Sequence, residues 1–170
     1  MELRTGEIHR MIMQQALELA QKSPPKSSNF RVGAVLVKLD GDKGYQVTAE
    51  GFTLERPGNT HAEECCLLKL AEEKCTTEEG LAEISMSPHA LYTTMEPCFK
   101  RLSGKLPCVE RVLRQKSWIK HVYIGVVEPE TFVGQNYGRQ MLEEAGIEVY
   151  HVAGLEREIL EVATAGHVSD

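Results

Sequence analysis

The chain has 170 residues, of which 42% are hydrophobic and 26% are charged. These values are typical of a folded globular protein and exclude a largely disordered chain. We expect one domain over residues 1–170, because domains usually contain about 100–200 residues. The net charge of −6 argues against a nucleic-acid partner. No apolar run approaches the ~20 residues of a membrane span, so we expect no membrane partner.

The first third of the sequence predicts a helix and then a β-hairpin. Apolar residues recur at helical spacing over 6–22, and Thr5 is a suitable N-cap. Two strands are predicted at 32–39 and 45–50. The residues between them, 40–44, contain the Gly and Asp typical of a turn.

The rest of the sequence alternates strands with helices. Helices are predicted at 61–75, 109–116, 140–145 and 155–164, and strands at 90–95, 121–127 and 147–152. The strand 121–127 is largely apolar, as expected of a strand buried on both faces. This order predicts a layered α/β domain with a mostly parallel sheet behind the hairpin. In such sheets, sites form beyond the carboxyl ends of strands and at helix N-termini.

The five cysteines are an odd number, and the N-terminus has no apolar signal segment. Both features argue against a disulfide framework and favour a reducing compartment, which we expect to be the cytoplasm. His61, Cys98 and Cys108 could supply one nitrogen and two sulfurs to Zn²⁺ and leave its fourth position open. Water bound there would have a pKa near ~7. Glu63 could take its proton, as in the H-x-E and Pro-Cys pattern of zinc deaminases.

The same residues also fit structural roles. Thr60 and Glu63 match a capping box, in which Glu63 would be purely structural. Cys65 lies one helical turn after His61 and could compete as a ligand. Cys65, Cys66 and Cys75 also fit the apolar pattern of the helix, and we interpret all three as core residues.

The chain resembles the cytidine-deaminase-like zinc enzymes over most of its length, through the segments 32–35, 61–63 and 96–98. The resemblance implies a three-layer α/β/α fold with a central mixed sheet of about five strands that begins with a hairpin. The common family pattern has two residues between the zinc cysteines, whereas nine separate Cys98 from Cys108. Such an insertion resembles the riboflavin-pathway pyrimidine deaminases.

The segments 134–138 and 142–149 resemble the same branch, within which the chain is most similar to the stand-alone fungal type. This implies hydrolytic deamination of 2,5-diamino-6-ribitylamino-4(3H)-pyrimidinone 5′-phosphate, with release of the 2-amino group as ammonia. Glu63 would be the catalytic proton carrier. Enzymes of this family commonly associate, so the resemblance also implies a homodimer.

The resemblance further suggests a set of substrate contacts: Asn29, Glu55, Arg56, Ala62, Thr94, Lys100 and Arg101. Asn29 also suits a simple turn before a strand. Lys100 and Arg101 lie on the insertion, which has no acidic residue and could bind a phosphate. The same insertion could equally be an ordinary solvated loop. The segment 53–54 departs from the bacterial pattern, which carries a His near there.

Three alternative functions remain. The first is a deaminase of another small base, nucleoside or nucleotide, of the deoxycytidylate or guanine type. The second is a tRNA deaminase, which the net charge disfavours. The third is a non-catalytic zinc scaffold, in which Glu63 would only cap a helix. A further hypothesis is that the tail, residues 165–170, closes over the site.

Overall fold

The computed structural model describes residues 5–41, 44–129 and 136–167. A five-stranded mixed sheet runs through its middle, in the order β2-β1-β3-β4-β5. Its strands are β1 (Gly33–Leu39), β2 (Tyr45–Phe52), β3 (His89–Met95), β4 (Ile119–Val126) and β5 (Glu148–His151). The hairpin strands are antiparallel, β1 is also antiparallel to β3, and β3, β4 and β5 are parallel.

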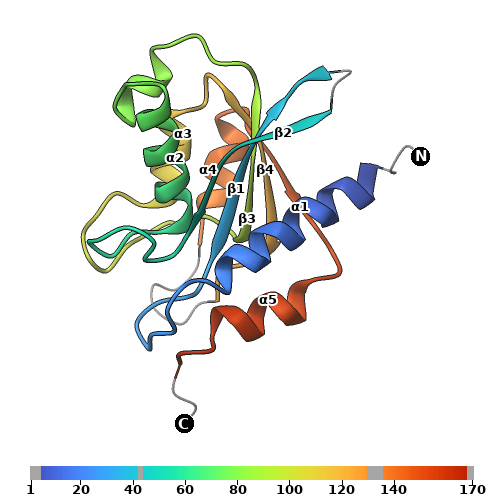
Figure 1. Ribbon diagram of the computed structural model, residues 1–170, viewed down its shortest axis with the longest axis vertical. Helices are drawn as coiled ribbons and strands as arrows, with labels where there is room; N and C mark the ends of the chain where they lie inside the picture. The colour runs from blue at the N-terminus through green and yellow to red at the C-terminus, as the bar shows by residue number, and fades with distance from the viewer. Residues whose placement is uncertain (1–4, 42–43, 130–135, 168–170) are drawn as a thin grey trace.

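Helices cover both faces of this sheet (Figure 1). Two of them, α1 (Thr5–Ala20) and α5 (Glu156–Ala163), lie on one face, and α2 (Ala62–Glu73), α3 (Cys108–Arg114) and α4 (Gly138–Glu144) lie on the other. A short 3₁₀ helix, η2 (Glu79–Ala82), follows α2. The three-layer α/β/α fold with a mixed sheet is therefore confirmed.

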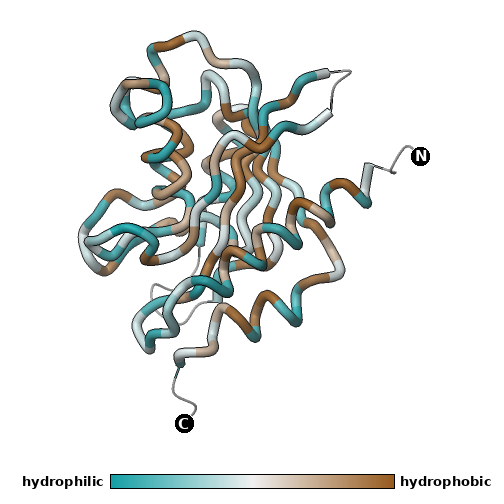
Figure 2. The backbone as a smooth tube through the Cα atoms, viewed as in Figure 1, coloured by the Kyte–Doolittle hydropathy of each residue, from teal (hydrophilic) through white to brown (hydrophobic). Residues whose placement is uncertain are grey.

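Side-chain alternation along the strands builds a hydrophobic core on each face. On β1, Leu36 faces the core under α2, α3 and α4, whereas Val35 and Val37 face the core under α1 and α5. Figure 2 shows the resulting apolar strands at the centre of the molecule. No described helix is both long enough and apolar enough to cross a membrane.

Gly51 sets the distance between β2 and the first turn of α2. A Cβ at Gly51 would lie 2.4 Å from the Ala62 carbonyl oxygen, which is closer than real Cβ atoms come. Only glycine therefore allows the helix to begin so close to the sheet. This packing also fixes the positions of His61 and Glu63, the two predicted site residues on either side of Ala62.

The predicted elements all form, with differences of one or two residues at most ends, and η2 was not predicted. Thr5 is the first described residue and lies within α1, so the prediction that it caps the helix is wrong. The strand predicted at 121–127 as buried on both faces is half-buried at His121 and Tyr123 and exposed at Val127. The reason is that β4 lies next to the short edge strand β5, and the aromatic ring of Tyr123 stacks on those of His9 and Tyr150 near the surface.

Candidate metal centre and active site

Three elements bring His61, Cys98 and Cys108 to one place. His61 is the extended N-cap of α2, Cys98 follows β3, and Cys108 is the first residue of α3. The Nδ1 atom of His61 lies 3.5 Å from the Sγ atom of Cys98 and 3.5 Å from that of Cys108. Ligand atoms of all three residues lie within 4.8 Å of one another, the spacing that a single ion requires.

The two thiols interact strongly with each other. A hydrogen bond from Cys108 lowers the pKa of Cys98 to about 4, while the same contact and burial raise the pKa of Cys108 well above its ordinary value. The backbone N–H of Cys108 also donates to the Cys98 sulfur, at 3.2 Å. The contact therefore favours deprotonation at Cys98 over Cys108, and both sulfurs would bind a metal as thiolates. One imidazole and two thiolates are a donor set that fits Zn²⁺ with an open position.

Glu63 lies beside these ligands on the first turn of α2. Its side chain is buried, and its carboxylate accepts a hydrogen bond from the Thr93 hydroxyl at 3.0 Å. Burial has the largest effect on the pKa of Glu63 and raises it, and the negative charge of Cys98 raises it further. A carboxyl group with a raised pKa is a stronger base than an ordinary glutamate, which suits a proton carrier in general acid–base catalysis.

The helix cap lies one residue later than the sequence predicts. The N-cap is His61, and the carboxylate of Glu64 accepts a hydrogen bond from its backbone N–H at 3.2 Å. The Thr60 hydroxyl instead closes the preceding turn, because it donates to the Arg56 carbonyl at 2.8 Å. The capping box of Thr60 and Glu63 is thus wrong, and Glu63 is not needed as a cap.

A cavity opens beside His61, Glu63 and Cys98, at the carboxyl ends of β3 and β4. This is where open α/β sheets bind ligands. Three predicted substrate residues line it, namely Asn29, Lys100 and Arg101. Lys100 is exposed, and its ammonium lies 5.6 Å from the centre of the Phe99 ring. The loop between the two cysteines therefore forms part of the cavity wall.

Two cavity-lining carboxyl groups, Glu96 and Glu128, were not predicted. Glu96 accepts a hydrogen bond from the backbone N–H of Glu128 at 2.9 Å. Burial raises the pKa of Glu128 to about 7, and its carboxylate accepts a hydrogen bond from Asn136 at 2.7 Å. The sequence signal was available, because both residues directly follow predicted strands at the edge where such sites form.

The other predicted substrate residues lie outside this lining. Arg56 pairs with Glu72, with nitrogen–oxygen distances of 2.5 and 2.7 Å. Glu55 pairs with Lys69. Thr94 is buried and accepts a hydrogen bond from the Gly33 N–H at 3.1 Å, and Ala62 is also buried.

The remaining cysteines lie away from the cluster. Cys65 and Cys66 are fully buried, as predicted, and the Cys66 thiol donates to the Ala34 carbonyl at 3.3 Å. Cys75 is exposed, so its prediction as a core residue is wrong. It lies beyond the end of α2 with a φ of 55°, where the apolar period of the helix no longer applies.

The described part of the tail lies against the cavity wall. The Nε2 atom of His167 is 2.9 Å from the Asn29 carbonyl oxygen, and the His167 ring lies 4.9 Å from that of Phe30. Asn29 and Phe30 both line the cavity. Residues 168–170 of the predicted tail and residues 134–135 of the predicted motif lie outside the described part of the chain.

Known proteins resemble the chain in both sequence and structure. The family model for the cytidine and deoxycytidylate deaminase zinc-binding region matches residues 7–126. The diaminohydroxyphosphoribosylamino-pyrimidine deaminase of Schizosaccharomyces pombe is 37% identical over 159 residues, which are 94% of this chain and 36% of that protein. The chain thus spans about a third of the length of this curated relative.

Two solved structures are also similar to the chain. The Aspergillus oryzae Rib2 deaminase in complex with DARIPP is 46% identical, with a TM-score of 0.85 over 94% of this chain and 91% of that one. RibD of Acinetobacter baumannii is 27% identical, with a TM-score of 0.71 over 96% of this chain and 40% of that one. The matched zinc-binding region and the three clustered donors together identify Zn²⁺ as the cofactor.

Proposed function

The chain belongs to the cytidine and deoxycytidylate deaminase family, and from this premise we propose that it is a zinc-dependent pyrimidine deaminase of riboflavin biosynthesis. The family resemblance in the sequence is thereby confirmed. The observation that carries the proposal is a buried carboxyl group, Glu63, in the same cavity as His61 and Cys98 of the ligand cluster. This combination suits hydrolysis better than a structural metal site, which is normally closed by four protein ligands.

The substrate in this proposal is 2,5-diamino-6-ribitylamino-4(3H)-pyrimidinone 5′-phosphate. The name of the yeast relative and the DARIPP complex of the Aspergillus enzyme support a phosphorylated aminopyrimidine. The loop of nine residues between Cys98 and Cys108 supports the same branch of the family. A phosphate ester needs a cation, and Lys100 supplies one at the cavity wall.

The metal would be held by Nδ1 of His61 and by the sulfurs of Cys98 and Cys108. When bound, Zn²⁺ acts as a Lewis acid and makes water a nucleophile at neutral pH. In the overall reaction, the bond from ring carbon C2 to its amino nitrogen breaks. An oxygen atom from water takes the place of that nitrogen, which leaves as ammonia.

Glu63 would move the protons of this reaction. Its carboxylate would take one proton of the attacking water and pass it to a ring nitrogen. It would then take the second proton, from the oxygen newly bonded to C2, and deliver it to the leaving amino group. Thr93 holds the carboxylate in place through its hydroxyl, and the buried setting keeps solvent from competing for the proton. One carboxyl group can therefore carry both transfers.

We further propose that Asn29, Lys100 and Arg101 contact the substrate from the cavity wall, together with Glu96 and Glu128. The predicted contacts Glu55, Arg56 and Thr94 lie outside the lining and would support the residues that form it. Ala62 would offer main-chain groups to the ring.

The tail beyond Ala165 would cover the cavity through the contact of His167 with Asn29. Deletion of residues 166–170 should change turnover, and unchanged turnover would contradict this closure.

We also propose that the enzyme is a cytoplasmic homodimer without a nucleic-acid or membrane partner. Five free cysteines, including the exposed Cys75, support a reducing compartment. The dimer rests on the family resemblance. Sedimentation of the zinc-loaded chain should give twice the monomer mass, and a monomer at working concentration would contradict it.

A substrate panel tests the proposed function. Ammonia release from the zinc-loaded chain should be fastest with the ribitylamino 5′-phosphate. The ribosylamino analogue, deoxycytidylate, guanine and a tRNA serve as the alternatives. Faster release from any of them would replace the proposed substrate, and no release from any would favour the zinc scaffold.

A further inference from the structure

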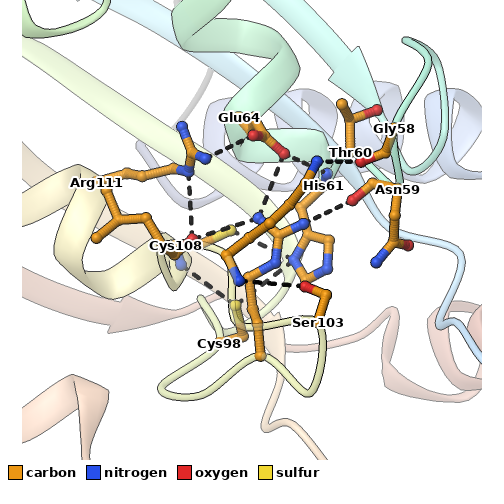
Figure 3. A network of polar contacts seen from close by, with 12 residues as sticks. Gly58, Asn59, Thr60, His61, Glu64, Cys98, Ser103, Cys108 and Arg111 are labelled. Atoms are coloured by element: carbon orange, nitrogen blue, oxygen red, sulfur yellow. Dashed lines mark hydrogen bonds and ion pairs between the residues drawn. The ribbon is translucent and has the colours of Figure 1, made fainter.

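The carboxylate of Glu64 lies where the three ligand-bearing segments meet (Figure 3). Its Oε1 atom accepts a hydrogen bond from the backbone N–H of His61 at 3.2 Å and lies 3.3 Å from Nη1 of Arg101. Its Oε2 atom accepts a hydrogen bond from Nη2 of Arg111 at 2.6 Å. Arg101 follows Cys98 by three residues, and Arg111 follows Cys108 by three. One side chain therefore bonds to each segment that carries a predicted zinc ligand.

The charges in this network are buried. The side chains of Glu64, Arg101 and Arg111 are 7%, 2% and 10% exposed. A buried guanidinium group needs a carboxylate beside it, because desolvation of an unpaired charge is costly. Arg111 has a second carboxylate in Glu78, at 2.5 Å. Among the described residues, the ion pair of Arg101 is with Glu64.

Arg101 also fixes the loop between the two cysteines. Its Nη2 atom donates to the Asn59 carbonyl at 2.6 Å, and its Nη1 atom to the Leu106 carbonyl at 3.3 Å. The side chain of Asn59 in turn accepts a hydrogen bond from Asn29 at 2.9 Å, and both asparagines line the cavity. The loop, the turn before α2 and the cavity wall are thus joined through one buried arginine.

We infer that Glu64 is a positioning residue for the metal centre and, through Arg101, for the substrate cavity. Its bonds to His61 and Arg111 fix the segments that carry the imidazole and the second thiolate. Its bond to Arg101 holds the loop against Asn59. The metal part of this inference stands on the ligand cluster, whereas the substrate part rests on the proposed function.

The metal part is tested with Glu64→Gln, which keeps an oxygen acceptor but removes the negative charge. The zinc dissociation constant should rise by ~10–100-fold, as for other residues that orient metal ligands. The absorption of the Co²⁺-substituted protein should also change, because its thiolate bands report ligand geometry. Glu72→Gln is the matched control, since Glu72 lies on the same helix and also pairs with an arginine, but is exposed. It should change neither readout.

An unchanged zinc affinity and cobalt spectrum in Glu64→Gln would overturn the metal part. Circular dichroism and a thermal melt establish that each variant is folded at the assay temperature. If Glu64→Gln is unfolded, the double variant Glu64→Gln/Arg101→Gln removes the carboxylate together with the cation that it pairs. It should fold while retaining the weakened zinc binding. Wild-type zinc affinity in the double variant would mean that Glu64 only balances charge, which also overturns the inference.

The substrate part is tested with Arg101→Gln, which leaves the bonds of Glu64 to His61 and Arg111. Zinc affinity should stay close to that of the wild type. KM should rise by about tenfold, the size expected for losing an ordering contact to a charged group, while kcat changes less. An unchanged KM would overturn this part. Absence of turnover in the wild type would instead reject the proposed function and leave the metal part standing.

Discussion

The two faces of the first turn of α2 carry adjacent glutamates in contrasting surroundings. Glu63 and Glu64 are both buried, with exposures of 4% and 5%. Glu63 faces the cavity and accepts a hydrogen bond from a neutral threonine, whereas Glu64 faces away from it and pairs with two arginines. Among the described residues, no lysine or arginine forms an ion pair with Glu63. Two identical side chains are thereby suited to different tasks by their surroundings.

Under the proposed function, this contrast gives the two adjacent glutamates different roles. A proton carrier needs a carboxyl group whose charge is not fixed, and burial beside Cys98 raises the pKa of Glu63 accordingly. A structural anchor needs partners that hold it, and two guanidinium groups hold Glu64.

Loss of a metal ligand should have the largest effect. Cys108→Ser removes one of the two sulfurs of the predicted zinc set. We expect it to lose zinc and turnover together, with a fall in zinc affinity beyond the ~10–100-fold that loss of an orienting partner causes. Zinc content after dialysis against a chelator measures this. Cys65→Ser, on the same helix as the glutamates, should keep its zinc. Loss of zinc from this variant would mean that Cys65 is a ligand.

Glu63→Gln should separate chemistry from metal binding. The amide cannot carry a proton, so turnover should fall by ~10²–10⁴-fold while zinc content and fold are kept. Steady-state ammonia release and metal analysis on the same sample check both parts. Retained turnover would assign Glu63 a structural role and would remove the contrast with Glu64.

Glu128→Gln should change how stability depends on pH. Because burial raises the pKa of Glu128 to about 7, the folded chain binds this proton more tightly than the unfolded chain does. The free energy of unfolding contributed by Glu128 therefore falls as the pH rises from about 4.5 to about 7. In urea unfolding, the free energy of unfolding of the variant minus that of the wild type should therefore be larger at pH ~8 than at pH ~5. An equal difference at both pH values would contradict the raised pKa.

The smallest effect is expected at the far end of α2. Cys75 is exposed beyond the last turn, so Cys75→Ser should change the free energy of unfolding by less than ~0.5 kcal/mol. Cys66→Ser, which places a hydroxyl in the buried contact with Ala34, is the matched variant and should destabilise more. A large loss in Cys75→Ser would restore the prediction that Cys75 packs in the core.

The fold could be predicted because hydrophobic periodicity records which faces are buried. The apolar strand that ends at Leu39, and the alternation of strands with helices after residue 89, indicate the sheet. The ends of the elements were less predictable, since they depend on single polar contacts. The N-cap is His61 and not the predicted Thr60, because the Thr60 hydroxyl forms hydrogen bonds with the backbone of Arg56. The sequence motif does not reveal this competing local contact.

The metal ligands could also be predicted, because their residue types and order are restrictive. The groups around them could not. Glu64 and Arg111 look like ordinary surface charges in the sequence, and Arg101 was predicted only as a substrate contact. Their burial together is what joins the three in one network. The place of Glu128 directly after a predicted strand could be read from the sequence. Its raised pKa could not, because that depends on burial in the cavity wall.

Hydrolysis in water labelled with heavy oxygen tests the central claim most directly. The zinc-loaded chain is mixed with the ribitylamino 5′-phosphate, and the product mass is measured together with ammonia. We predict that each product molecule carries one labelled oxygen and that one ammonia is released with it. A product without the label, or formed without ammonia, would contradict hydrolytic deamination at this site.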